Sequence, residues 1–182
     1  MIFRETKLGG AFIVELEKFE DDRGFFARSW SEREFAGRGL ESCLVECNIS
    51  FNKQKGTLRG MHYQAPPHGQ IKMVRCTSGS IYDVIIDLRT ESPTFKQWIG
   101  VELTARNRLT LYVPKDFAHG FQTLENETEV FYQMSSPYVP ESGRGVRWND
   151  PAFGIDWPEP RKIIINERDG NYSGFVGPSN QS

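Results

Sequence analysis

Eight short apolar runs, spaced about ten residues apart, occupy the middle of this chain. Turn residues separate them, as in Pro66-Pro67-His68-Gly69, Thr77-Ser78-Gly79 and Glu91-Ser92-Pro93. This pattern predicts short antiparallel strands, and eight or more of them with few helices predict an all-β sandwich or barrel of the jelly-roll kind. The runs are Leu44–Phe51, Leu58–Gln64, Ile71–Thr77, Ser80–Leu88, Gln97–Thr104, Leu109–Val113, Gly120–Leu124 and Glu129–Met134.

The segment before these runs contains one further strand and one helix. Ile13 to Phe19 alternates in polarity and predicts a strand, which a turn at Asp21 to Gly24 ends. Ser31 and Glu34 match a capping box, and Gly37 is a typical stop signal. We therefore expect a short helix over Ser31 to Ala36, the only convincing helix in the chain.

The C-terminal part is irregular and rich in proline and tryptophan. Its sequence WNDPAFGIDWPEP, within residues 146–169, is expected to wrap around the barrel. Ile163 to Ile165 offers one more apolar strand, and Gly170 to Ser182 is expected to be a loose tail. The length of 182 residues suits a single domain over 1–182.

The composition bears on the kind of partner and the cellular setting that the protein can have. A formal net charge of −2 gives no basic excess, so nucleic acid is not expected as the main partner. No window approaches the roughly 20 apolar residues that span a membrane, and the N-terminus lacks the apolar run of a signal peptide. Cys43, Cys47 and Cys76 lack metal-ligand spacing and are expected to be reduced thiols of a cytoplasmic protein.

The stretch from Gly56 to Lys72, GTLRGMHYQAPPHGQIK, is too polar and too broken by glycine and proline to be ordinary core. One interpretation is a strand that delivers Arg59, His62 and Lys72 to a common cavity. The other is an exposed hairpin with an incidental histidine. The stretch alone favours neither.

Alternation places charged residues among apolar neighbours on two predicted strands. Lys72 shares a face with Val74 and Cys76, and Asp83 and Asp87 share a face with Ile81 and Ile85. Burial of unpaired charges is costly, so either these faces point outward or the barrel contains a polar site. The presence of His62 and His119 in addition favours a site.

Two other candidates are ambiguous when taken alone. His119 lies in PKDFAHGF, where Pro114 and Gly120 predict a tight connection ahead of a strand. Tyr132 alternates with Val130 and Met134, and by itself it is best explained as core filler with a bonded hydroxyl.

A metal centre is not favoured by the histidine spacing. Many cupin barrels bind metal through a closely spaced histidine pair, and this chain has no pair at i, i+2. His62, His68 and His119 could still converge in space.

Several ordered motifs identify a family. The chain resembles the dTDP-4-dehydrorhamnose 3,5-epimerases, sugar-nucleotide enzymes of the cupin superfamily, from about Phe3 to Asp169. The motifs are DDRGFF (Asp21–Phe26), GTLRGMHYQ (Gly56–Gln64), SPTF (Ser92–Phe95), PKDFAHGF (Pro114–Phe121), VRWNDPAFGIDWP (Val146–Pro158) and, more weakly, NERD (Asn166–Asp169).

The resemblance implies a cupin-type jelly-roll barrel that forms a homodimer and uses no metal and no organic cofactor. It implies inversion of C3 and C5 of a nucleotide-linked 4-keto-6-deoxyhexose through an enolate. His62 matches the general base, Asp169 the carboxylate that orients it, Tyr132 the general acid on the opposite face, and Lys72 the group beside the carbonyl. The positions that match substrate binding are Arg23, Asn48, Arg59, Lys72, His119 and Tyr138.

The chain departs from the family pattern outside the proton-transfer residues. Many members have glutamate at Arg28, glutamine near Glu46 and Cys47, and an acid at Gly143. The nucleotide base, the sugar and the number of inverted carbons therefore stay open. The alternatives are an epimerase of C3 only or C5 only, a metal-dependent cupin, and a barrel that binds sugar nucleotides without converting them.

Overall fold

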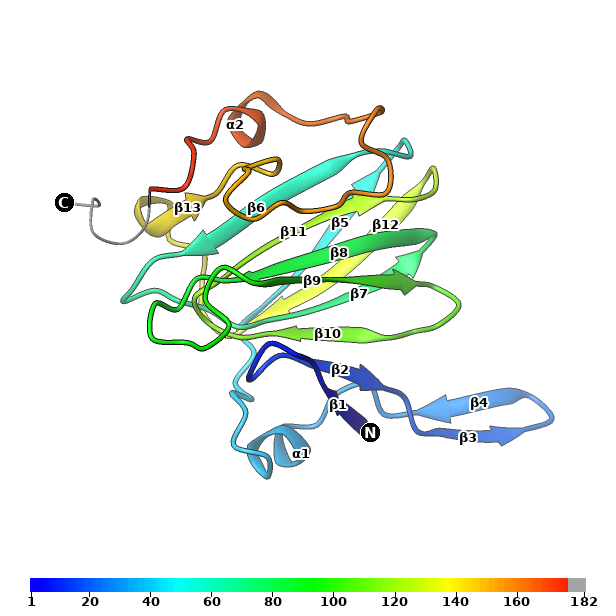
Figure 1. The fold of residues 1–182 in the computed structure, drawn as a ribbon. Coiled ribbons are helices and arrows are strands. Elements are labelled where there is room, and N and C mark those ends of the chain that lie inside the picture. Colours follow the sequence, from blue (N-terminus) through cyan, green and yellow to red (C-terminus); the bar gives the residue numbers. More distant parts are fainter. Residues whose placement is uncertain (177–182) are drawn as a thin grey trace.

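Two facing β-sheets form the body of the protein in the computed structural model, which describes residues 1–176 (Figure 1). One sheet has six strands in the order β1-β2-β10-β7-β12-β5, and the other has five in the order β13-β6-β11-β8-β9. The six are β1 (Ile2–Glu5), β2 (Phe12–Glu15), β10 (Thr110–Val113), β7 (Lys72–Ser78), β12 (Thr128–Met134) and β5 (Glu46–Asn52). The five are β13 (Gly143–Gly145), β6 (Leu58–Gln64), β11 (Phe117–Thr123), β8 (Ser80–Asp87) and β9 (Trp98–Thr104).

The core lies between the two sheets because alternate residues of each strand point inward. Val74 and Val130 from the six-stranded sheet pack with Ile81, Ile85 and Phe121 from the five-stranded sheet. All five are buried. The predicted all-β architecture is confirmed.

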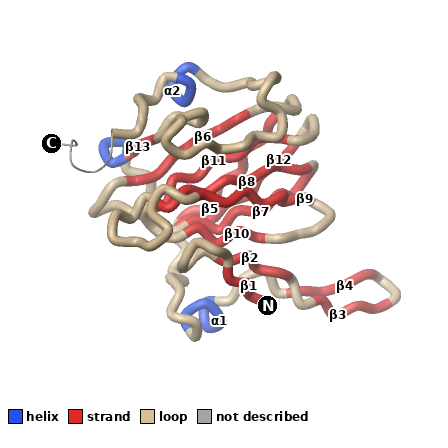
Figure 2. Tube along the Cα trace, in the orientation of Figure 1, coloured by secondary structure: helices blue, strands red, loops and turns tan. Residues whose placement is uncertain are grey.

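Irregular segments and one helix cover the outer faces of both sheets. Phe35 of α1 (Glu32–Ala36) packs against Met73 and Tyr112 outside the six-stranded sheet. Phe153 and Trp157 pack with Val84 and Ile86 of β8, on the outside of the other sheet. Figure 2 shows the chain that follows β13 as a long loop on the side of that sheet.

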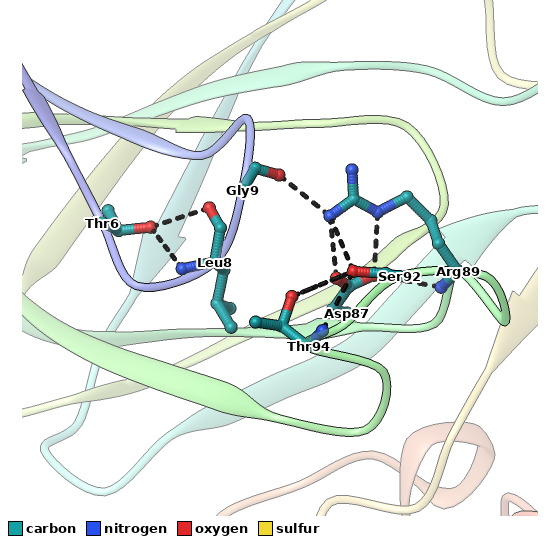
Figure 3. A network of polar contacts seen from close by, with 7 residues as sticks. All are labelled: Thr6, Leu8, Gly9, Asp87, Arg89, Ser92 and Thr94. Atoms are coloured by element: carbon teal, nitrogen blue, oxygen red, sulfur yellow. Dashed lines mark hydrogen bonds and ion pairs between the residues drawn. The ribbon is translucent and has the colours of Figure 1, made fainter.

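A buried carboxylate organises the loop that follows β8 (Figure 3). Asp87 is fully buried and accepts hydrogen bonds from Arg89 Nε at 2.9 Å, Ser92 Oγ at 2.6 Å and Thr94 Oγ1 at 2.7 Å. Arg89 Nη2 also donates to the carbonyl of Gly9 at 2.9 Å, which links this loop to the N-terminal turn. Asp83 is fully buried as well, so β8 directs both aspartates inward.

The N-terminal segment differs from the prediction at two places. The single strand over Ile13 to Phe19 is wrong, because β2 ends at Glu15 and β3 (Lys18–Asp21) pairs with β4 (Gly24–Ala27) in a separate hairpin. The turn between β3 and β4 lies where it was predicted. The helix is confirmed, but Ser31 makes no side-chain capping bond. Glu34 instead accepts from the amino group of Met1 at 3.1 Å and from Arg28 at 3.3 Å.

Differences at the C-terminal side are also local. β11 begins at Phe117, so His119 lies inside a strand and not in a connection. Ile163 to Ile165 forms only one parallel bridge, Ile164 to Thr57, in place of a strand. The 3₁₀ turn η1 (Pro140–Ser142) and helix α2 (Glu167–Gly170) were not predicted. Residues 177–182 of the predicted tail lie outside the described residues. Within residues 1–176, no helix has the length and apolar character that a membrane span requires.

Candidate active site

A bulge in β6 places Arg59 and His62 on the same face of this strand. β6 pairs with β11 so that His62 lies opposite His119 and Arg59 opposite Phe121. Three residue steps on β6 thus face two on β11, which is the geometry of a β-bulge. Gly60 permits it, because its φ is 138° and an added Cβ would lie 2.5 Å from Cα of Gly120.

His62 forms a hydrogen-bonded pair with Asp169 of α2. The distance from His62 Nε2 to Asp169 Oδ1 is 2.8 Å, and Asp169 is 1% exposed. Asp169 Oδ2 accepts the N–H of Gly60 at 3.2 Å, and Asn166 caps α2 through the N–H of Asp169 at 2.7 Å. The bulge and the helix cap therefore both fix the carboxylate that holds the histidine.

The charge states of this pair follow from burial and hydrogen bonding. Burial alone would raise the pKa of Asp169, but hydrogen bonds from His62, Gly60 and Arg168 outweigh it and lower the pKa. Burial lowers the pKa of His62, and Asp169 opposes that effect. An ionised Asp169 accepts the Nε2 proton of a neutral His62, which leaves Nδ1 unprotonated.

Two adjoining cavities of about 570 and 250 Å³ lie beside this pair. His62, Lys72, Tyr132 and Arg168 line both of them. His62 belongs to the five-stranded sheet, whereas Lys72 and Tyr132 belong to the six-stranded sheet. A ligand in this space would therefore lie between an imidazole on one sheet and a phenol on the other.

Burial changes the acidity of both groups on the six-stranded sheet. It lowers the pKa of Lys72 to about 8, while the negative charge of Asp83 acts in the opposite direction. It raises the pKa of the Tyr132 phenol, which Arg59 partly offsets. Tyr132 consequently keeps its proton at neutral pH.

A second histidine–carboxylate pair lies deeper in the barrel. His119 Nε2 is 2.7 Å from Asp83 Oδ1, and both side chains are buried. Asp83 Oδ2 is buried without a hydrogen-bond partner among the described residues. The polar interior that the sequence left open is therefore present, and the outward interpretation is wrong for β8.

Comparison with known proteins identifies the family. The sequence profile of dTDP-4-dehydrorhamnose 3,5-epimerase matches residues 5–176. The dTDP-4-dehydrorhamnose 3,5-epimerase of Salmonella typhimurium is 43% identical over 170 residues, which cover 93% of this chain and 92% of the relative. The chain belongs to the dTDP-4-dehydrorhamnose 3,5-epimerase family.

Solved structures of this epimerase family have the same fold. The enzyme from Elizabethkingia anophelis has a TM-score of 0.94 at 40% identity, with 96% of each chain covered. The enzyme from Bacillus anthracis, solved with TDP and PPi bound, has a TM-score of 0.91 at 40% identity, with 96% of this chain and 99% of that chain covered. The cupin-type jelly roll that the sequence predicts is confirmed.

Most residues that match the epimerase site surround these cavities. Arg59 lines the smaller one with His119, and its Nε donates to Asn52 Oδ1 at 2.7 Å. Asn48 and Tyr138 line the larger one. The exposed-hairpin interpretation of Gly56 to Lys72 is therefore wrong, because β6 is an interior strand of its sheet and Lys72 begins β7 of the other.

Arg23 is the one predicted site residue that lies apart from the cavities. It occupies the turn between β3 and β4, where its side chain is 90% exposed and bonds Asp21 at 2.6 Å. Figure 1 shows this hairpin projecting from the body of the protein. Within one chain, Arg23 cannot act on a ligand in the cavity.

The departures from the family pattern have different structural settings. An added Cβ at Gly143 would lie 3.0 Å from Oη of Tyr138, so glycine here accommodates the tyrosine. Arg28 pairs with Glu34 away from the cavities. The structure gives no account of Glu46 or Cys47 beyond their positions on the edge strand β5.

The described residues contain no group of three His, Cys, Asp or Glu side chains placed to hold a metal ion. In this part of the chain, His62, His68 and His119 do not converge. Cys43, Cys47 and Cys76 are free thiols.

Two residues that line the larger cavity were missed by sequence reasoning. Arg168 Nη2 lies 3.4 Å from His62 Nε2, and Tyr172 contacts the imidazole of His62. Arg168 stands next to Asp169 in the NERD motif, which was the available signal. Tyr172 falls in the stretch predicted to be a loose tail, and no sequence pattern singles it out.

Proposed function

We propose that this protein is an isomerase that inverts C3 and C5 of dTDP-4-dehydro-6-deoxyglucose to give dTDP-4-dehydrorhamnose. The observation that carries the proposal is the placement of His62, with Asp169, and Tyr132 on opposing sheets around one cavity. Epimerisation beside a ketone needs a base on one face of the sugar and an acid on the other. Membership of the epimerase family supports this reaction class.

His62 is the base in this proposal. Its Nδ1 takes the proton from the carbon next to the C4 ketone, and the C–H electron pair forms the enolate. Asp169 stabilises the resulting imidazolium and holds the ring, as the aspartate of a serine-protease triad does. The low exposure of Asp169 and its hydrogen bond to Gly60 support a fixed orientation.

Lys72 stabilises the enolate oxygen in this scheme. Lys72 is half-buried at the cavity, where a charge acts more strongly than in bulk water. A preorganised donor of this kind is worth about 3–4 kcal/mol in other enzymes. The nearby negative charge of Asp83 helps Lys72 remain protonated.

Tyr132 returns a proton to the opposite face of the same carbon. Its raised pKa supports the protonated phenol as the resting form. After donation, the phenolate and the imidazolium of His62 must exchange their protons with solvent before the second carbon reacts.

The nucleotide part of the substrate needs cations and an aromatic surface. Arg59 and Arg168 supply forked donors that suit a diphosphate, and Asn48 and His119 supply further polar contacts. Tyr138, which is 53% exposed at the larger cavity, is suited to stacking on the base.

Solvent deuterium exchange tests this function directly. The 4-keto sugar nucleotide is incubated with protein in heavy water, and C3 and C5 are followed by NMR. We expect deuterium at both carbons together with net inversion. Exchange at one carbon would indicate a single-site epimerase, and binding without exchange would indicate a barrel that does not convert the sugar.

We further propose that the protein acts as a homodimer. Ile49 and Phe51 of the edge strand β5 are 64% and 51% exposed, and Phe19 and Phe26 of the β3–β4 hairpin are 65% and 72% exposed. Exposed apolar residues along an unpaired edge favour association with another chain. A second copy would cover this surface and would allow its hairpin to bring Arg23 towards the neighbouring cavity.

A further inference from the structure

Strand β13 leaves room beside the candidate base for one aromatic ring. Gly143 and Gly145 lie two residues apart and thus share a face of β13, and Gly145 is the register partner of His62. An added Cβ at Gly145 would lie 2.3 Å from the ring of Tyr172. That distance is too short for any side chain, so glycine at this position accommodates the ring.

Tyr172 uses this space to contact His62. The two ring centroids are 6.1 Å apart with an interplanar angle of 72°, an edge-to-face arrangement. Tyr172 is half-buried and lines the larger cavity. The imidazole is therefore constrained at Nε2 by Asp169 and along its side by Tyr172.

We propose that Tyr172 is a positioning residue for His62, which closes the site on the side of β13 and holds the imidazole in the orientation that proton abstraction requires. This inference rests on the proposed function, because it assigns Tyr172 a role only if His62 is the base. Tyr172 itself transfers no proton in this account.

The charged groups around His62 determine what removal of the ring should do. Asp169 and Arg168 face it from α2, Lys72 from β7, and His119 lies opposite it on β11. Asp169 favours the imidazolium, whereas burial, Lys72 and Arg168 disfavour it. Loss of the Tyr172 ring would admit water to His62 without removing Asp169, so the pKa of His62 should rise.

Variants at position 172 separate orientation from simple folding. We expect Tyr172→Ala to lower kcat about three- to tenfold and to raise the pKa of His62 by about half a unit, as expected from losing one aromatic contact and part of the burial. Tyr172→Phe keeps the ring edge and should restore most of both values. Tyr172→Leu, which keeps apolar bulk without an aromatic ring, should lower kcat as the alanine variant does but leave the pKa of His62 close to the wild-type value, because it still excludes water.

The pKa of His62 is measured by NMR titration of the intact protein, with its signal assigned through His62→Ala. In Tyr172→Ala, the acid limb of the kcat/KM profile should move to higher pH by the same amount as the pKa of His62. A kcat equal to that of the wild type in both Tyr172→Ala and Tyr172→Leu, or a His62 titration curve that does not move in Tyr172→Ala, would overturn the inference. Recovery of kcat by leucine as complete as by phenylalanine would reduce Tyr172 to a space-filling role and would also overturn it.

Gly145→Ala gives an independent test in a double-mutant cycle. It should reproduce the Tyr172→Ala effects because it displaces the ring, and it should add little in the Tyr172→Ala background. Full additivity of the two changes would contradict the proposed contact. If the wild type failed to exchange deuterium, the proposed function would fail, whereas the NMR titration would still report on the contact.

Discussion

At the scale of single residues, His62 must be unprotonated while Lys72 is protonated, although both line one cavity. His62 acts as a base only when neutral, and Lys72 stabilises an enolate only when protonated. Burial lowers the pKa of both groups. Their active forms coexist at pH values between the two pKa values.

This coexistence predicts a bell-shaped pH dependence of kcat/KM. The acid limb should lie below about 6.5, the ordinary value for histidine, because the pKa of His62 is lowered. The basic limb should lie near the Lys72 pKa of about 8, since the charged form is lost as the pH rises through that value. The measurement is kcat/KM across pH 5 to about 10 at constant ionic strength.

Lys72→Arg is the matched variant, because a guanidinium stays protonated across this range. It should lower activity but remove the basic limb. A basic limb that persists in Lys72→Arg would assign that limb to another group, such as Tyr132, and would contradict the role of Lys72.

The family resemblance named the side chains that we propose for proton transfer but not their surroundings. His62 lies in GTLRGMHYQ and Asp169 in the weaker NERD motif, whereas Tyr132 lies in none of the motifs and was assigned from the resemblance as a whole. Arg168 reaches the cavity from α2, a one-turn helix that is too short to give a periodic pattern, and Tyr172 follows this helix in the chain. Asp83 shows the same limit, because alternation gives its face but cannot reveal that His119 is its partner.

At the scale of elements, the bulge in β6 explains why glycine was misleading as a turn signal. Gly120 was interpreted as the end of a connection, but it lies within β11, where an added Cβ would be 2.6 Å from Met61 Sδ and 2.8 Å from Arg59 O. Close packing of two strands and a tight turn both select glycine. Sequence alone cannot separate these causes.

Strand limits were harder to predict than strand positions for a similar reason. The pattern from Ile13 to Phe19 alternates without interruption, yet the chain changes pairing partner between Glu15 and Lys18. Alternation reports which face a side chain takes, whereas the partner depends on the tertiary fold. The capping box failed because Glu34 binds the amino group of Met1, which is distant in sequence.

The loop between β8 and β9 should depend on the carboxylate of Asp87. We expect Asp87→Asn to lower the free energy of unfolding by about 2–3 kcal/mol at pH 7, because it weakens charge-assisted bonds to Arg89, Ser92 and Thr94. Urea unfolding measures the change. Asp22→Asn, at an exposed turn, is the control and should stay within about 0.5 kcal/mol of the wild type.

At acid pH, the wild type and Asp87→Asn should have nearly the same free energy of unfolding. Burial alone would raise the pKa of Asp87, but its hydrogen bonds lower it to about 2, against 3.8 for a free aspartate. A depressed carboxyl pKa contributes stability above the unfolded-state value that disappears as the pH falls through the folded-state value. The difference in free energy of unfolding between the two proteins should therefore shrink between about pH 4 and pH 2. A gap independent of pH would show that the charge of Asp87 is not its cause.

At the scale of the whole molecule, the exposed apolar surface around β5 predicts self-association. Ile49→Asp should raise the dimer dissociation constant by about 100-fold or more, because it would bury a charge without a partner. Thr90→Asp adds the same charge to the loop between β8 and β9 and should leave the dimer unchanged. Analytical ultracentrifugation gives the masses, and a wild-type monomer at micromolar concentration would contradict the dimer.

Three expectations about the whole chain stay predictions. They are the single-domain organisation over 1–182, the cytoplasmic setting, and the absence of a cofactor. None of them alters the chemistry proposed for the cavity, which depends on side chains that the structure describes.

The claim on which the account depends is that His62 and Tyr132 serve opposite faces of one sugar. The most direct test is NMR of the 4-keto sugar nucleotide in heavy water with His62→Ala and Tyr132→Phe. We predict that His62→Ala abolishes deuterium uptake, whereas Tyr132→Phe retains some uptake but gives little net inversion. Equal and mild losses of uptake and inversion in both variants would contradict it.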